Sequence, residues 1–211
     1  MGQTIMTEFK DLFTLYPVTR QHPLHQVIDE VDVVIDFTCA NSSFQHAIEA
    51  IKHRKPIIIG TTGLTKAMLD VLEEQANEKG VGCLYAPNFA YGAIWMNAVI
   101  GELSKAYKTI DIKEIHHISK LDTPSGTALR LKDEMLAANP DSTIHISSER
   151  QYTKQVVHRI TFQKEGESLS LQHIVTNRKA YLHALEAAVH AIVKIDGWIP
   201  YDIHFFQNKN T

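Results

Sequence analysis

Two adjacent histidines and a lysine lie close together in the middle of the chain. They are His116, His117 and Lys120. Histidine gains and loses a proton near neutral pH, so one ring could donate a proton while the other binds a ligand or only packs. Successive residues of a strand point to opposite faces, so the two rings need not share a role. A histidine pair alone is more often structural than catalytic, and its neighbours must decide between these readings.

The polar residues that follow belong to a Pro-Ser-Gly-Thr turn. Ser125, Gly126 and Thr127 stand where a helical pattern begins, and Ser125 has the residue type of an N-cap. The free N–H groups of a helix start, with the positive end of the helix dipole, attract a carboxylate or a phosphate. Lys120 adds a full positive charge just upstream. Together these residues predict a site for an anionic substrate.

The stretch from Glu114 to Ala128 resembles the signature of the bacterial dihydrodipicolinate reductase family. It reads Glu-Ile-His-His, then Lys after two intervening residues, then, after one more, Asp-Thr-Pro-Ser-Gly-Thr-Ala, with Thr123 where the family usually has Ala. The resemblance implies a reductase that uses NADH or NADPH in the diaminopimelate route to lysine. The roles it implies are catalytic for His116 and Lys120, and binding of the substrate carboxylates for His117, Ser125, Gly126 and Thr127.

Strands and helices must position these residues. Strand-like alternation occurs in four segments, 109–118, 143–147, 156–163 and 168–176, with a hairpin turn between the last two. They predict a four-stranded sheet in an α+β substrate and oligomerisation domain, residues 88–177, which also carries a largely buried helix at 92–107. One face of that sheet would lack a helix and need a partner. The family forms tetramers, so a homo-oligomer is expected.

The first half of the chain has the pattern of a parallel sheet. Residues 31–37 and 55–59 are near-continuous apolar runs, typical of strands buried on both faces, with a helical pattern between them. We therefore predict an α/β protein whose first domain, residues 1–87 with 178–211, is an incomplete Rossmann-like layer. Ligands bind beyond the carboxyl ends of such strands, where Thr38 and the Gly-Thr-Thr-Gly run would lie.

The assignment of cofactor contacts rests on the resemblance. In the family, pieces like Asp-Phe-Thr at 36–38 and Gly-Thr-Thr-Gly at 60–63 lie beside the nicotinamide half of the cofactor. The Ala-Pro-Asn-Phe run at 86–89 resembles the hinge between the two domains. The implied cofactor-binding residues are Gly2, Thr38, Gly60, Thr61, Thr62, Gly63, Ala86, Asn88 and Phe89.

The start of the chain departs from the family pattern. A dinucleotide-binding fold needs a strand and a glycine-rich turn before its first helix. Here residues 3–13 already have the apolar spacing of a helix, and Met1-Gly2 resembles only the end of that turn. The alternative is that Met1 is the start codon and that the match of Gly2 is a coincidence. We expect an N-terminally abbreviated domain, then a brief strand at 15–20. Without the glycines that let backbone approach the pyrophosphate, NADPH or NADH should bind weakly.

A second departure leaves two functions open. The segment 148–155 contains no glycine, although the family has a glycine-rich loop with an arginine there, which Arg150 could replace. The first function is NAD(P)H-dependent reduction of 4-hydroxy-tetrahydrodipicolinate, favoured by the intact His116 and Lys120. The second is a diverged or truncated relative that binds a cyclic dicarboxylate, or pairs with a full-length reductase, without hydride transfer. The absent first strand and the lost glycines at the approach to the cofactor phosphates favour the second.

The composition of the chain limits the classes of binding partner and the compartment that we expect. The chain has 211 residues, 44% of them hydrophobic, and a net charge of -3, which gives no reason to expect nucleic acid or an anionic membrane. No apolar run approaches ~20 residues and no signal peptide is recognised, so we expect a cytoplasmic protein. Cys39 and Cys83 are expected to be reduced and buried. The twelve histidines are scattered without metal-ligand spacing, and no metal is predicted.

Overall fold

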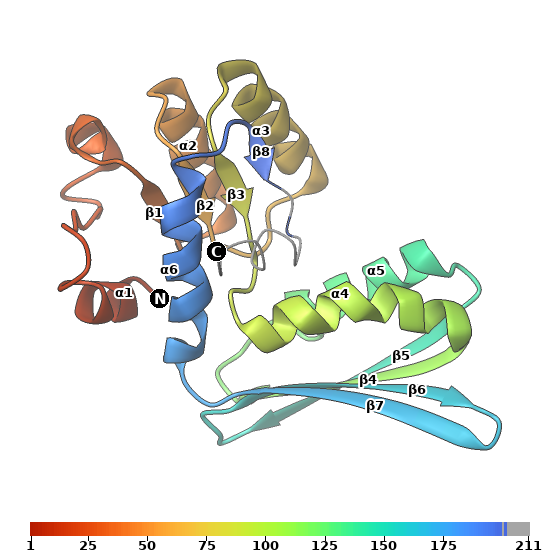
Figure 1. Cartoon of the computed structure of the whole chain (residues 1–211). Helices are drawn as coiled ribbons and strands as arrows, with labels where there is room; N and C mark the ends of the chain where they lie inside the picture. The colour runs from red at the N-terminus through yellow and green to blue at the C-terminus, as the bar shows by residue number, and fades with distance from the viewer. Residues whose placement is uncertain (200, 202–211) are drawn as a thin grey trace. The chain divides into compact units, whose positions relative to one another are not determined.

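The computed structural model describes residues 1–199 and residue 201, which form two compact units. Unit 1 contains residues 1–89 and the described residues from 181 onward, and unit 2 contains residues 90–180. Figure 1 shows the elements of both. Residue 200 and residues 202–211, which belong to the predicted first domain, lie outside the described part of the chain.

Unit 1 is built on a parallel sheet with strand order β1-β2-β3-β8. Its strands are β1 (Val34–Asp36), β2 (Ile57–Ile59), β3 (Cys83–Tyr85) and β8 (Trp198–Ile199). Its long helices are α2 (Ala40–Lys52), α3 (Lys66–Lys79) and α6 (Leu182–Ile192). Helices α2 and α3 pack together, and α6 packs on β2 (Figure 1). The buried isoleucines of β2 confirm the predicted parallel strand, because they are covered on both faces.

The N-terminal residues of unit 1 differ from the prediction. Helix α1 spans only Gly2–Glu8, and short 3-10 turns follow at Leu24–Gln26 and Ile28–Glu30. The strand predicted at 15–20 is wrong, since the described residues 9–23 contain no strand. Tyr16 and Val18 are each 40% exposed, so the β-prone side chains there have no surface to pack on.

Unit 2 confirms the predicted four-stranded sheet. Among its described residues the strands are β4 (Thr109–His117), β5 (Thr143–Gln151), β6 (Val156–Lys164) and β7 (Glu167–Val175). Their order is β5-β4-β6-β7, with β4 parallel to β5 and the other pairs antiparallel. Helices α4 (Tyr91–Ala106) and α5 (Gly126–Ala138) lie on one face of the sheet (Figure 1). No helix among residues 90–180 covers the other face.

The core of unit 2 lies between the two helices and the sheet. Met96 and Ile100 of α4, Leu131 and Met135 of α5, and Ile110 and Phe162 of the sheet are buried together. Two details correct the prediction: the helix expected to be largely buried exposes Trp95 by 52%, and β5 continues to Gln151 instead of ending at Ser147. Arg150 therefore lies in a strand and not in a loop.

Two further properties of the described chain concern its helices and its cysteines. None of its helices combines the length and the apolar character that crossing a membrane would require. Both cysteines are free thiols, but only Cys83 is buried; Cys39 is exposed, contrary to the prediction, because it caps the start of α2 at the sheet edge.

Candidate active site

The predicted junction between strand and helix is present in unit 2. Strand β4 ends at His117, and α5 begins at Gly126. Ser125 is the N-cap, since its Oγ accepts a hydrogen bond from the backbone N–H of Ala128 at 3.2 Å. Its own backbone N–H donates to Glu114 Oε1 at 3.0 Å. The helix start is thereby tied to the strand that carries His116.

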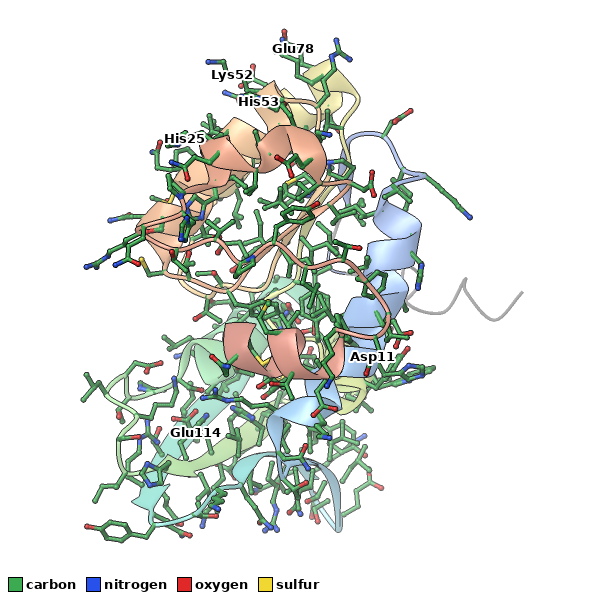
Figure 2. All side chains as sticks on the ribbon, turned by 90° about the vertical axis from the view of Figure 1, so that its left-hand side faces the viewer. Asp11, His25, Lys52, His53, Glu78 and Glu114 are labelled. Carbon is green, nitrogen blue, oxygen red and sulfur yellow. The ribbon has the colours of Figure 1, made fainter. Side chains whose placement is uncertain are left out.

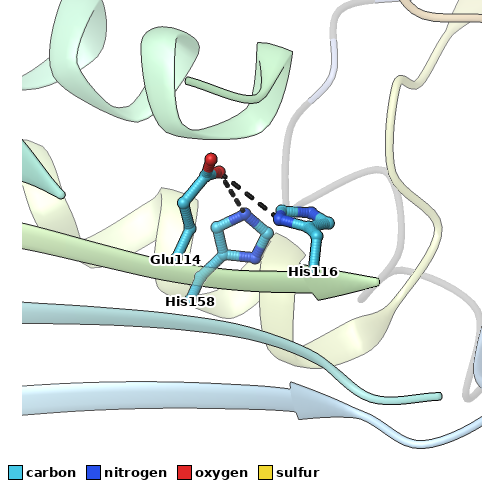
Figure 3. Close-up of side chains that lie close together, drawn as sticks. All are labelled: Glu114, His116 and His158. Atoms are coloured by element: carbon cyan, nitrogen blue, oxygen red, sulfur yellow. Dashed lines mark ion pairs between the residues drawn. The ribbon is translucent and has the colours of Figure 1, made fainter. Parts of the chain in front are cut away.

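A buried cluster lies beneath this junction. Glu114 and His116 are two residues apart in β4 and therefore point to the same face of the sheet. Glu114 is also in register with His158 of the neighbouring strand β6. Glu114 Oε2 lies 3.6 Å from His116 Nδ1 and 3.7 Å from His158 Nε2 (Figure 3). The two rings meet edge to face with centroids 5.2 Å apart. All three side chains are buried.

Arg150 connects the cluster to the loop that carries Lys120. Its guanidinium lies 3.3 Å from Glu114 Oε1. It also donates hydrogen bonds to the carbonyl oxygens of Lys120 and Asp122 and to Thr123 Oγ1, at 3.3, 2.5 and 2.9 Å. Thr123, the residue that departs from the family signature, thus supplies an acceptor for Arg150. The arginine fixes the loop that presents Lys120.

Lys120 already holds a carboxylate in this structure. Its Nζ lies 2.8 Å from Asp122 Oδ1. The pKa of Asp122 lies below its ordinary value, first because Lys120 donates this hydrogen bond; slight burial opposes the shift, and the backbone N–H groups of Asp122 and Gly126 add to it. The carboxylate therefore meets both a lysine and the first residue of α5, which are the donors predicted for an anionic substrate.

His117 lies apart from the cluster. As the alternation of a strand predicts, it points away from His116 and is exposed. Its Nδ1 is 2.7 Å from Ser119 Oγ, and its ring meets that of Tyr152 edge to face. The structure brings together His116, Lys120, Ser125 and Gly126 as neighbours of one loop, but it does not place His117 with His116.

The two buried histidines are held neutral. Burial lowers the pKa of His116 below its ordinary value; Glu114 opposes this, whereas Lys120 and Arg150 act with burial. Burial also lowers the pKa of His158, to about 4, with a further contribution from His116. For Glu114, burial raises the pKa, but hydrogen bonds led by those from Ser125 outweigh it, so the group stays ionised at neutral pH.

In unit 1 a buried aspartate organises the carboxyl ends of β1 and β2. Asp36 accepts hydrogen bonds from the hydroxyls of Thr38 and Thr61 at 2.8 and 2.9 Å, and its other oxygen lies 2.6 Å from His46 Nδ1. Burial raises the pKa of Asp36, but the contacts with His46 and Thr38 lower it to about 2. Two of the predicted cofactor residues are therefore held side by side at the edge where ligands bind.

The other predicted cofactor residues of unit 1 have mixed settings. Gly60 has a packing reason for lacking a side chain, because a Cβ there would lie 2.0 Å from the Phe37 ring. Gly63 adopts a φ of 89°, which favours glycine. Thr62 is exposed, and so is Gly2 at the start of α1. Ala86 and Phe89 are buried, and the carbonyl of Asn88 accepts a hydrogen bond from the Tyr201 hydroxyl at 2.6 Å.

Most other histidines of unit 1 are surface residues. His25 and His53 are both exposed side chains of unit 1 (Figure 2). The one group of possible metal ligands among the described residues is Glu114 with His116 and His158, whose ligand atoms lie within 4.8 Å of one another. Arg150 already supplies a positive charge to that carboxylate.

Sequence reasoning missed two members of the cluster. The family signature includes Glu114 without implying a function for it. Its position two residues before His116 nevertheless places both side chains on one face of the strand. His158 gave no signal, because its place beside Glu114 depends on the register of two antiparallel strands, which no local pattern reveals.

Comparisons with known proteins agree with this architecture. Residues 3–89 match the family model described as dihydrodipicolinate reductase, N-terminus, and residues 92–201 match the one described as dihydrodipicolinate reductase, C-terminus. The protein named 4-hydroxy-tetrahydrodipicolinate reductase from Dictyoglomus turgidum is 31% identical over 208 residues, covering 88% of this chain and 77% of the relative. Its namesake from Bacillus cereus strain ATCC 14579 is 33% identical over 196 residues, covering 82% and 73%.

A solved structure shares the fold. The dipicolinate-bound dihydrodipicolinate reductase from Paenisporosarcina sp. TG-14 superposes with a TM-score of 0.71 at 24% identity, covering 88% of this chain and 80% of that one. The two family models together span nearly the whole chain. The chain belongs to the dihydrodipicolinate reductase family.

Proposed function

We propose that this chain reduces 4-hydroxy-tetrahydrodipicolinate with NADPH or NADH, the reaction that places the family in the diaminopimelate route to lysine. One observation of the site carries the proposal. Lys120 and the first residue of α5 hold the carboxylate of Asp122, within the electrostatic reach of His116. The site is thus built to bind a carboxylate beside a group that can carry a proton.

In the proposed complex, a substrate carboxylate takes the place of Asp122. Lys120 provides the charge, while the N–H groups at the start of α5, from Gly126 and Thr127, fix the position of the carboxylate. Ser125 holds that helix start in place through its bond to Glu114. A ring with two carboxylates would be held against rotation by such contacts, which is the orientation that hydride transfer requires.

His116 is the proposed proton donor. A bound nicotinamide cofactor supplies the hydride, and the reduction of a conjugated imine leaves negative charge that a group titrating near neutral pH can neutralise with one proton. His116 is buried, so its proton is shielded from exchange with bulk water before it is used. Lys120 is its positively charged neighbour.

The direct test is an assay of the purified chain. NADPH or NADH oxidation should depend on substrate made in place by a dihydrodipicolinate synthase, and pyridine-2,6-dicarboxylate should inhibit competitively. Binding of that dicarboxylate without any cofactor oxidation would favour the second function, a relative that binds a cyclic dicarboxylate without hydride transfer. No binding and no oxidation would reject both.

The residues of unit 1 fit one half of a dinucleotide better than the other. Thr38, Thr61 and Gly63 stand at the carboxyl ends of parallel strands, where the nicotinamide half would bind. Toward the diphosphate, residues 3–59 contain no glycine, and the candidates among the described residues are Gly2 and the short helix α1. A helix dipole contributes only ~0.3–1 kcal/mol at an exposed site, whereas a Kd near ten micromolar requires roughly 7 kcal/mol.

We therefore expect the 211-residue chain to bind both cofactors weakly and to discriminate little between them. Calorimetric titration with NADPH and with NADH measures this directly. Heat-denatured chain serves as the blank, and pyridine-2,6-dicarboxylate serves as the positive control for an intact substrate site. Low-micromolar binding of either cofactor would contradict the expectation.

The open face of the sheet in unit 2 supports a further part of the proposal, a homotetramer. That face has no helix on it among residues 90–180 and carries mainly polar side chains, such as Lys113 and Arg159. Pairing of such faces between copies would rest on polar contacts and ion pairs more than on apolar burial.

A further inference from the structure

Glu114 occupies a position that the proposed roles leave unexplained. It is fully buried, and its two carboxylate oxygens have different surroundings. Oε1 accepts a hydrogen bond from the backbone N–H of Ser125 and faces the Arg150 guanidinium. Oε2 is buried without a hydrogen-bond partner in the described part of the chain, and so is Nδ1 of His116, 3.6 Å away (Figure 3).

The distance of 3.6 Å between Glu114 Oε2 and His116 Nδ1 is only slightly longer than a hydrogen bond. A charge-assisted N–H···O bond has a length of about 2.7–2.9 Å, so less than ~1 Å of movement would close it. Two facing buried polar atoms without partners are unfavourable, which biases the pair toward closing. Oε1 is anchored by Ser125 and Arg150, so the carboxylate can keep its position while the His116 ring adjusts.

The charges around His116, together with its burial, disfavour the protonated form of its ring. The groups that face it are Glu114 on β4, Lys120 and Asp122 in the loop, Arg150 on β5 and His158 on β6, with His173 of β7 behind. Two carboxylates and two cations balance, so a protonated His116 would add an uncompensated positive charge. His158 and His173, whose pKa values are both lowered by burial, do not compete as cations.

A bound dicarboxylate would reverse this balance. It brings two negative charges to the cations that disfavour protonation of His116, and negative charge within about 4–6 Å favours the protonated form. Glu114 then stabilises the imidazolium through Nδ1, which leaves Nε2 as the atom that gives its proton to the substrate. His116 would therefore become protonated when the dicarboxylate binds.

We infer that Glu114 is a positioning residue that holds His116 through Nδ1 and makes that ring take up a proton when a dicarboxylate binds. The inference rests on the proposed function, because it needs a dicarboxylate at Lys120 and α5. It adds a role for Glu114 and predicts that binding and protonation are linked.

Calorimetry of the full chain tests the linkage without turnover. Pyridine-2,6-dicarboxylate is titrated at pH 7.5 in buffers with different ionisation enthalpies, and the dependence of the observed heat on buffer gives the number of protons taken up. We expect uptake approaching about one proton per site. Uptake should vanish in His116→Gln and fall strongly in Glu114→Gln. Glu102→Gln is the matched control, because it removes an exposed carboxylate of α4 that pairs with Lys105.

The outcomes separate the inference from the proposed function. Binding without proton uptake in the unchanged protein overturns the inference and leaves the proposed function standing, whereas absence of binding rejects both. Undiminished proton uptake in a folded Glu114→Gln variant would show that a group other than Glu114 stabilises the added proton. That result would overturn the role of Glu114.

The pH dependence of kcat provides a readout that loss of packing would not move. The proton donor works in its protonated form, so activity falls as pH rises through the pKa of His116 in the complex. Removing the negative charge in Glu114→Gln lowers that pKa, and the alkaline limb should move to lower pH by about one to three units. Glu114→Asp keeps the charge, is the safer variant for folding, and should move the limb less in the same direction. An unmoved limb in a folded variant overturns the inference.

Discussion

Replacing His116 with glutamine should lower kcat by about 10²–10⁴-fold, the usual contribution of a positioned general acid. Glutamine is polar and of similar length, but its amide does not titrate near neutral pH, so it cannot act as a general acid. Because burial lowers the pKa of His116 and favours its neutral form, its replacement should cost much less in binding than in turnover. Steady-state kinetics together with calorimetry of pyridine-2,6-dicarboxylate separate the two effects.

His145→Gln is the matched control for this variant. His145 lies on β5 in the same sheet, but it is exposed, and its strand register pairs it with Asp111 instead of the cluster. Its replacement should leave kcat unchanged. If kcat of His116→Gln were also unchanged, His116 would not be the proton donor, and the exposed His117 would become the group to test.

The site could be predicted from the sequence where its parts are local. Ser125 is an N-cap because a serine followed by helical spacing has few alternatives, and the opposite orientations of His116 and His117 follow from the alternation of a strand. Lys120 and Asp122 pair with each other because they are two residues apart in one loop. Each of these relations is contained within a few residues of chain.

Relations between distant segments were not predictable in the same way. His158 reaches Glu114 only through the register of β4 and β6, and Arg150 reaches the Lys120 loop only because β5 continues past Ser147. The continuation follows from pairing, since each added residue of β5 lies beside a residue of β4 up to His117. A strand that ends where its neighbour ends is a tertiary effect, which a single-strand pattern does not contain.

The fold shows the same division. The isoleucine run of β2 is identified by its apolar side chains alone, because a parallel strand buried on both faces needs them all. Residues 15–20 have strand-forming types as well, yet Tyr16 and Val18 are exposed and no strand forms there in the described chain. What decides between the two cases is a neighbouring strand, which lies elsewhere in the sequence.

Replacing Lys120 with alanine should weaken binding of pyridine-2,6-dicarboxylate by about 10–100-fold, because a hydrogen bond to a charged group contributes about 1.5–3 kcal/mol. The loss has two parts. The ligand loses its cation, and Asp122, which Lys120 now neutralises at 2.8 Å, is left as a repelling charge beside the helix start. Calorimetry measures the total, with Lys105→Ala as control, since Lys105 is an exposed lysine of α4 that pairs with Glu102.

A second variant separates these two parts. Asp122→Asn releases Lys120 and the Gly126 N–H from the carboxylate that now engages them, so the dicarboxylate should bind more tightly than to the unchanged protein. In the double variant Lys120→Ala/Asp122→Asn the repulsion is gone, and the remaining loss is that of the lysine alone. If Asp122→Asn instead weakened binding, Asp122 would be needed to place Lys120, and the idea that substrate replaces it at α5 would be wrong.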